Sequence, residues 1–288
     1  MMEIEKEHWD IVIKPRGSNF SLNIKEVWKY RDLVRMYIHR DIVTQYKQTI
    51  LGPFWYVIQA LFTTILYMFV FGGIAQISTD GLPQVLFYLS GIVCWNYFLE
   101  CLNKGSGTFS SNASVFSKVY FPRLVVPISG AISGLLKFFI QFTLFFIAYL
   151  YYCFFTDAAI TPNAYILLFP LLIFLLAGFG IGFGMIVSSM TTKYRDLAIL
   201  FTFISSLWMY ITPVIYPLSV MEQNYADYMW IIQLNPLTSI IEVMRYGWMG
   251  VGTFTWLSFT YSIVVTLFSM IFGIWIFNKV ERSFIDVV

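Results

Sequence analysis

The sequence has few charged residues. Only 12% of its 288 residues are charged, while 58% are hydrophobic and 20% are aromatic. Soluble domains average roughly 25% charged residues, so a soluble fold of this composition would leave much apolar surface in contact with water. The composition excludes a soluble enzyme and, with a net charge of only +2, a nucleic-acid-binding protein. It predicts an all-α integral membrane protein, because membrane spans of this apolar character are helical.

Cysteine and histidine are also scarce. The three cysteines, Cys94, Cys101 and Cys153, lie in apolar stretches, and the only histidines are His8 and His39. We interpret the cysteines as small buried side chains and not as a disulfide framework. Because no Cys, His or Asp residues cluster at ligand spacing, we expect no protein-bound metal.

Catalytic motifs are missing as well. The sequence contains no GxxxxGK[ST] phosphate loop, no HExxH and no GxSxG. Glu100 and Lys137 are the only charged residues within long apolar segments, whereas ion-coupled transporters keep several such groups at mid-membrane. We therefore expect no catalytic residue and an energy source outside this chain. We also expect the Lys137 side chain to reach partly toward the membrane surface.

Six segments are apolar enough and long enough, or nearly so, to supply the about 20 residues of a membrane-spanning helix. They are residues 53–74, 85–103, 127–155, 164–190, 197–216 and 255–277. The sequence thus divides into a polar N-terminal segment, 1–52, and a six-span transmembrane domain, 53–288.

The basic residues predict the orientation of these spans. Nine of the eighteen Lys and Arg residues precede residue 48, and seven more follow the second, fourth and sixth spans. Only Arg245 lies in a connection on the opposite side. Since Lys and Arg are retained in cytoplasmic connections, we expect both termini in the cytoplasm.

Residues 23–40 have apolar side chains at helical spacing and a basic polar face. This pattern is typical of a helix in the membrane interface and equally of a solvated helix packed on a partner. Both alternatives place it at the cytoplasmic surface. The connection 104–126 combines Lys118 and Arg123 with Phe116 and Phe121, a mixture that suits docking of a soluble partner, although a plain surface helix would also fit.

The fourth predicted span contains Gly178, Gly180, Gly182 and Gly184. Small residues at this spacing let helix backbones approach closely in lipid. We favour this packing role, and a hinge is the alternative.

Residues 213–251 are neither properly polar nor long enough to span the membrane twice, and prolines break them into short helices. Such backbone is tolerated at membrane depth only where protein or water satisfies it, so we expect a re-entrant helical hairpin on the outer face. Glu242 and Arg245 are three residues apart on its second helix. They are expected to pair with each other, or one of them could meet a polar substrate.

Several motifs are distinctive. They are Glu26-Val27-Trp28-Lys29-Tyr30-Arg31-Asp32-Leu33, Arg40-Asp41-Ile42, Tyr46-Lys47-Gln48-Thr49, Leu51-Gly52 with Trp55, Phe121-Pro122-Arg123 with Pro127, Tyr194-Arg195-Asp196, Thr212-Pro213-Val214-Ile215-Tyr216 and Asn235-Pro236. Together they resemble the permease subunits of bacterial ABC transporters that export cell-surface polysaccharides such as O-antigen, capsule and teichoic acid. The likeness covers essentially the whole chain. It departs at Ala60, where the family commonly has proline, and this puts a kink at that position in doubt.

The resemblance implies a homodimer above two copies of a separate ATPase subunit, which would bind the ATP and magnesium. It also implies an inner-membrane location and a lipid-linked polysaccharide as cargo. The residues expected to contact the ATPase are Trp28, Arg31, Asp32, Arg40, Asp41, Lys118, Phe121, Arg123, Arg195 and Asp196. Those expected at an outer gate are Pro213, Tyr216, Trp230, Glu242 and Arg245.

Aromatic rings stack on the CH faces of sugars, so an aromatic-lined path could pass a long glycan. The candidates are Trp55, Tyr56, Phe62 and Tyr67 of the first span and Phe201, Trp208 and Tyr210 of the fifth. For each ring, contact with lipid is the simpler alternative. A drug or small-lipid exporter remains the second functional hypothesis, and a membrane glycosyltransferase is disfavoured by the shortage of carboxylates.

Overall fold

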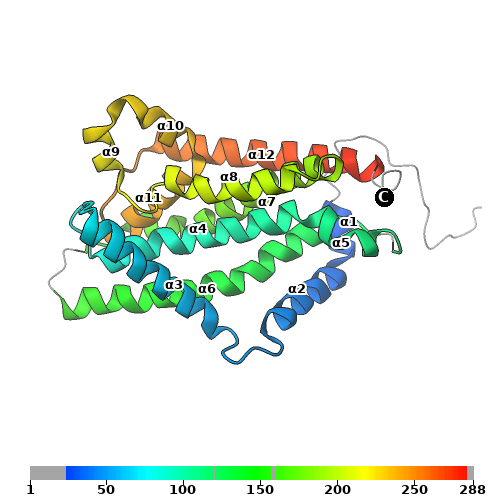
Figure 1. The fold of residues 1–288 in the computed structure, drawn as a ribbon, viewed down its shortest axis with the longest axis horizontal. Coiled ribbons are helices and arrows are strands. Elements are labelled where there is room, and N and C mark those ends of the chain that lie inside the picture. Colours follow the sequence, from blue (N-terminus) through cyan, green and yellow to red (C-terminus); the bar gives the residue numbers. More distant parts are fainter. Residues whose placement is uncertain (1–23, 120, 157–159, 284–288) are drawn as a thin grey trace, which may run out of the picture.

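The computed structural model describes residues 24–119, 121–156 and 160–283, and every regular element in these ranges is a helix (Figure 1). In chain order they are α1 (Ile24–Lys29), α2 (Arg31–Tyr46), α3 (Phe54–Tyr67), η1 (Met68–Ile74), α4 (Gln84–Ser106), α5 (Thr108–Phe116), α6 (Val125–Phe155), η2 (Ala164–Leu168), α7 (Phe169–Lys193), α8 (Leu197–Ile211), α9 (Leu218–Asn224), η3 (Ala226–Tyr228), α10 (Met229–Leu234), α11 (Pro236–Met249) and α12 (Trp256–Ser283).

Five of the six predicted spans are long, apolar helices. In the described part of the chain they cover Phe54–Ile74, Gln84–Ser106, Val125–Phe155, Ala164–Lys193 and Trp256–Glu281. The sixth, α8, has 15 residues and is about 22 Å long, which is shorter than the roughly 30 Å hydrocarbon core. It ends before Pro213, whose missing N–H and whose ring disfavour a continued helix.

α4 lies at the centre of the bundle. It packs against α7, α6 and α3, and it contributes more buried residues to the largest hydrophobic core than any other helix, from Leu86 to Leu102. α12 packs on the other side of α7. In Figure 1 the long helices run alongside one another, with α5 near one end of the bundle and α9 to α11 near the other. We call these the α5 end and the α9 end.

The glycines of α7 account for its close packing on both neighbours. A Cβ on Gly184 would lie 2.7 Å from the Leu102 carbonyl oxygen of α4, and one on Gly182 would lie 2.7 Å from the Met270 nitrogen of α12. Gly180 faces α4 in the same way, and Gly178 faces α12. Alternate glycines thus approach opposite helices, which supports the packing role.

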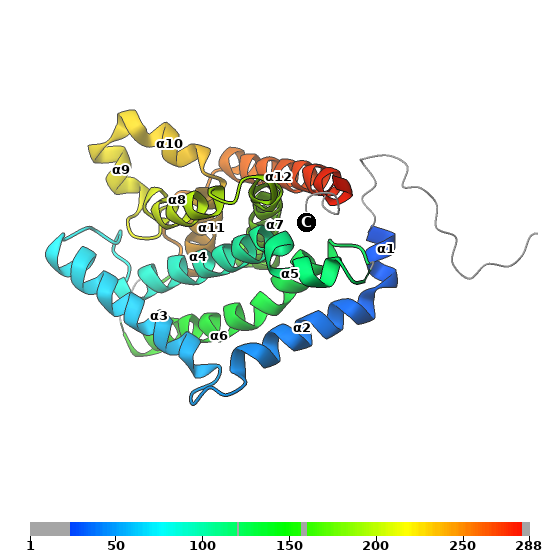
Figure 2. The same cartoon turned by 45° about the vertical axis from the view of Figure 1, so that its right-hand side comes forward.

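The N-terminal helix differs from its predicted bounds. The helix is interrupted at Tyr30, between α1 and α2, and α2 then continues to Tyr46. α2 packs on α6 and lies beside it in both views (Figures 1 and 2). Residues 1–23 of the predicted N-terminal segment, and both chain termini, lie outside the described residues.

The predicted outer hairpin consists of short helices at the α9 end. α9, η3 and α10 lead into α11, where Asn235 accepts a hydrogen bond from the Leu237 N–H and donates its Nδ2 to Thr212 Oγ1 at 2.8 Å. α11 is almost wholly buried and ends at Gly250, which has φ 73°, a conformation suited to glycine. Ala60 is buried within a continuous α3, without a break at that position.

Candidate functional site

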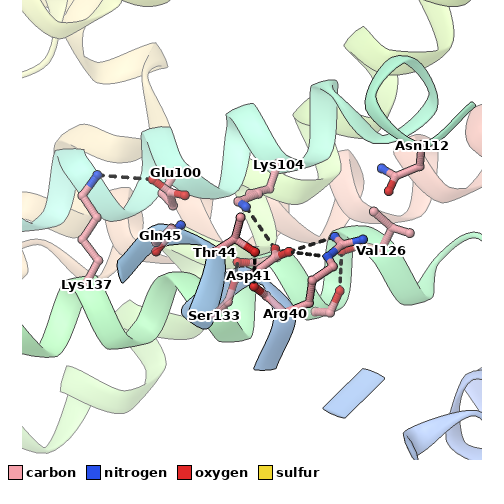
Figure 3. A network of polar contacts seen from close by, with 12 residues as sticks. Arg40, Asp41, Thr44, Gln45, Glu100, Lys104, Asn112, Val126, Ser133 and Lys137 are labelled. Atoms are coloured by element: carbon pink, nitrogen blue, oxygen red, sulfur yellow. Dashed lines mark hydrogen bonds and ion pairs between the residues drawn. The ribbon is translucent and has the colours of Figure 1, made fainter. Parts of the chain in front are cut away.

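Asp41 links the N-terminal helix to the centre of the bundle. Its carboxylate lies 2.8 Å from Arg40 on the same helix and 3.0 Å from the Lys104 ammonium on α4 (Figure 3). The Asp41 side chain is only 11% exposed, so this pair is less screened than a surface pair. Lys104 also sits in the last turn of α4, where the helix dipole favours a cation. The pair therefore couples the position of α2 to that of α4.

Aromatic packing fixes α2 on the α5–α6 connection. Tyr37 is buried, and its ring centroid is 6.0 Å from that of Phe121, which itself packs on Phe116 at 5.5 Å. The Arg40 guanidinium lies over the Tyr37 ring at 4.2 Å. Burial raises the pKa of the Tyr37 phenol, and Arg40 partly opposes this rise. The same face of α2 therefore carries an ion pair and an aromatic contact.

A groove of about 460 Å³ lies between α2 and the α5–α6 connection. We call it the coupling groove; its lining residues are Tyr30, Leu33, Met36, Tyr37, Arg40, Val115, Val119 and Phe121. The lining is mostly apolar, and Met36 and Val119 are 61% and 58% exposed. Arg40 and Phe121 were predicted from the sequence, whereas Met36 and Val119 were missed because single exposed apolar residues give no sequence signal.

The other predicted contact residues are dispersed. Trp28, Arg31 and Asp32 are exposed on α1 and α2, and Lys118 is exposed after α5. Arg195 and Asp196 are exposed in the turn between α7 and α8.

Arg123 is different, because its side chain is buried. It donates Nη1 to the Glu281 carbonyl of α12 at 2.8 Å and lies over the Phe116 ring at 5.2 Å. In this conformation Arg123 joins the start of α6 to the end of α12 and offers little surface to a separate subunit.

A second polar group joins α3, α4 and α6. The Lys137 ammonium lies 3.3 Å from Glu100 and 5.1 Å from the centre of the Tyr56 ring. Gln141 donates to the Tyr56 carbonyl at 3.3 Å and accepts from Asn96 at 3.1 Å. Lys137 was expected to reach toward the membrane surface, but it pairs with Glu100 on the neighbouring helix, as Figure 3 shows. This pair could not be predicted from sequence spacing, because the two residues are 37 positions apart on different helices.

The candidate path aromatics fall into two groups. Trp55, Phe62 and Tyr210 are 51%, 70% and 59% exposed. The other four, Tyr56, Tyr67, Phe201 and Trp208, are half-buried. Tyr67 donates to the Met209 sulfur at 3.4 Å, and this contact links α3 to α8.

Trp208 packs edge-on against Phe98 of α4 and Phe183 of α7, and these contacts hold α8 on the bundle. α8 nevertheless has no buried residue, and only 11% of the α3–η1 span is buried. Of the predicted spans, these two therefore have large apolar faces that no other part of the described chain covers.

Glu242 and Arg245 form the buried ion pair that was expected. Their side chains are 3.2 Å apart and only 3% and 2% exposed. Arg245 also donates to the Pro213, Val214 and Phe87 carbonyls, at 2.6, 3.0 and 3.3 Å, and Glu242 accepts from the Thr253 N–H. These bonds connect α11 to α4 and to the chain that follows α8.

The remaining gate candidates lie around this pair. Pro213 is buried, Tyr216 is half-buried and donates to the Ile211 carbonyl, and Trp230 is 60% exposed. Cys94 and Cys101 are buried free thiols. Among the described residues no group of three or more Cys, His, Asp or Glu could hold a metal ion.

Comparison with known proteins identifies the family. The ABC-2 type transporter family matches residues 32–249, and the chain belongs to this family. It is 26% identical over 259 residues to the O-antigen export system permease protein RfbA of Klebsiella pneumoniae, covering 89% of this chain and 95% of that one. A second RfbA, from Myxococcus xanthus, is 24% identical over 76% of this chain and 80% of its own length. The capsule polysaccharide export inner-membrane protein CtrC of Neisseria meningitidis is 22% identical over 85% and 89%.

Proposed function

We propose that this protein is the membrane subunit of an ATP-driven exporter that moves lipid-linked polysaccharide, of the O-antigen type, across the bacterial inner membrane. The observation that carries the proposal is the near full-length similarity to permeases named for O-antigen and capsule export. The sequence has no phosphate-binding loop, so ATP and magnesium belong to a separate subunit.

The proposed topology has six spans with both termini in the cytoplasm. Lys104 and Lys193 lie in the last turns of α4 and α7, and Lys118 and Arg195 lie in the connections that follow α5 and α7. The distribution of basic residues therefore favours the α5 end as the cytoplasmic end. α8 would span together with residues 212–216. The helices α9 to α11 would then form a re-entrant hairpin at the outer face. Arg245 donates to the Pro213 and Val214 carbonyls, and Tyr261 and Ser262 of α12 donate to the Leu234 and Pro236 carbonyls.

The exposed faces of α3 and α8 support a homodimer. Two apolar spans with little intrachain packing need either lipid or a second copy against them. A second copy would place Trp55, Phe62 and Tyr210 along a shared path, where rings can stack on sugars.

The coupling groove is the proposed docking place for the ATPase subunit. Its apolar lining and the adjacent Arg40 match the core and rim of a protein interface. Movement of the groove would reach α4 through the pair of Asp41 and Lys104, and α6 through the packing of α2. The groove thus gives the N-terminal segment, 1–52, a mechanical role.

Deletion of the gene tests this function in cells. The expected result is loss of the surface polysaccharide on gels, with lipid-linked glycan accumulating on the cytoplasmic side, and restoration by the intact gene. The alternative, a drug or small-lipid exporter, predicts unchanged surface glycan and increased retention of small hydrophobic dyes. Unchanged glycan would contradict the proposal.

A further inference from the structure

A cavity of about 520 Å³ with both apolar and polar lining residues lies at the α5 end, on the side of α4 where α8 packs. Two pairs of consecutive elements form it: α4 with α5, and α7 with α8. Its volume falls within the roughly 300–1,000 Å³ of small-molecule sites. It shares no lining residue with the coupling groove.

Hydroxyl groups dominate the polar lining of this cavity. Six serine and threonine side chains donate their single proton to a backbone carbonyl three or four residues earlier, at 2.7–3.3 Å: Ser106, Ser110, Thr191, Thr192, Thr202 and Ser205. A hydroxyl whose proton is already engaged can only accept further hydrogen bonds. The polar side chains of this lining are therefore mainly oxygen acceptors, together with the Asn103 amide and the Arg195 guanidinium.

This chemistry selects a ligand rich in hydroxyl donors. Phosphate groups are mainly acceptors at neutral pH, so they match Arg195 but not the six hydroxyls. A sugar chain donates from each ring and also has apolar CH faces, for which Phe201, Leu102 and Val187 supply apolar lining. Phe201 is also the one predicted path aromatic that lines the cavity.

We propose that this cavity is a sugar-binding vestibule, which accepts a segment of the glycan on the cytoplasmic side before it moves along α8. The inference rests on the proposed function and adds a site to it. Binding here depends on the number of hydroxyl donors that the glycan offers and not on the identity of its sugars. The lining Ser and Thr hydroxyls are spread over α4–α5 on one side and α7–α8 on the other, and this spacing does not select the stereochemistry of one sugar.

Protection of a cysteine in the cavity tests the site directly. Ser106→Cys would be placed in the complete complex with its ATPase subunit in lipid nanodiscs, and its rate of reaction with a maleimide measured. Maltoheptaose at high millimolar concentration is expected to slow labelling at least twofold. Inorganic phosphate and phosphatidylglycerol in the nanodisc are expected to leave the rate unchanged.

A matched pair of double variants assigns the protection to the hydroxyls. Thr192→Val/Thr202→Val removes two lining acceptors, and Thr143→Val/Thr156→Val removes two exposed threonines that also bond to the carbonyl four residues earlier. We expect the first pair to weaken maltoheptaose protection roughly three- to tenfold, the loss expected for one or two hydrogen bonds. The second pair should leave protection intact.

The vestibule would be ruled out if maltoheptaose gave no protection, or if both double variants were protected equally. Protection by phosphate or phosphatidylglycerol alone would also rule it out, because the occupant would then be an anionic headgroup. The gene deletion separates these failures from that of the proposed function. Lost surface glycan without protection removes the vestibule only, whereas unchanged surface glycan removes the exporter function itself.

Discussion

At the scale of single residues, two ion pairs have different tasks. Asp41 and Lys104 join α2 to α4 with partial exposure, so their geometry can change as the helices move. Glu242 and Arg245 are buried, and their remaining polar atoms bond to backbone groups. A buried charge without its partner is costly, and this pair therefore fixes the fold at the α9 end.

Replacing Asp41 by Asn should weaken coupling. The substitution leaves the Lys104 ammonium without a carboxylate, and we expect lower glycan export per ATP hydrolysed, with a loss of stability of about 1–2 kcal/mol. Asp227→Asn is the control, because the exposed Asp227 lies on η3 at the α9 end and is not among the expected ATPase contacts. The ratio of transport to ATPase activity is the measurement, and equal ratios in both variants would contradict this role.

Replacing Arg245 by Met should destabilise the protein by about 3–5 kcal/mol, because Glu242 stays buried without a counter-charge. The double variant Glu242→Gln/Arg245→Met should recover part of this loss. Thermal unfolding in detergent measures both. A single variant as stable as the wild type would show that the pair does not hold α11 in place.

At the scale of helices, the sequence predicted the long spans but not their contacts. Apolar length is a local property, and five predicted spans appear within a few residues of their expected bounds. α8 is shorter than expected because Pro213 ends it. The N-terminal helix continues past its expected end at Arg40 to Tyr46, where Asp41 pairs with Lys104 and Tyr46 packs on Tyr56. The pairing of Glu242 with Arg245 was predictable from their spacing of three, whereas that of Asp41 with Lys104 depends on the packing of α2 against the bundle.

Gly182→Ala tests the close packing of α7 on α12. The new Cβ would meet the Ser269 and Met270 backbone at 2.7 Å, and overpacking of this kind costs about 1–3 kcal/mol. Gly73→Ala is the control, since its nearest neighbour is at 3.7 Å. Thermal unfolding should show a lower midpoint temperature only for Gly182→Ala. Equal midpoint temperatures for the two variants would contradict close packing of α7 on α12 at this position.

At the scale of the whole molecule, the proposed docking groove for the ATPase and the proposed path of the glycan lie on different helices. The coupling groove lies on α2 and the α5–α6 connection, while the exposed aromatic faces lie on α3 and α8. α4 connects the two regions, because its Lys104 pairs with Asp41 of α2 and its Glu100 pairs with Lys137 of α6. This arrangement suits a permease that is moved by a separate motor and whose cargo passes between two copies.

Reconstituted transport tests the central claim most directly. Proteoliposomes would contain this protein with or without its ATPase subunit, together with lipid-linked polysaccharide, and the glycan reaching the opposite leaflet would be measured. The account predicts ATP-dependent translocation only when both subunits are present, and none with an ATPase whose phosphate-loop lysine is replaced. Translocation by this chain alone, or glycan that stays in its original leaflet with both subunits and ATP, would contradict it.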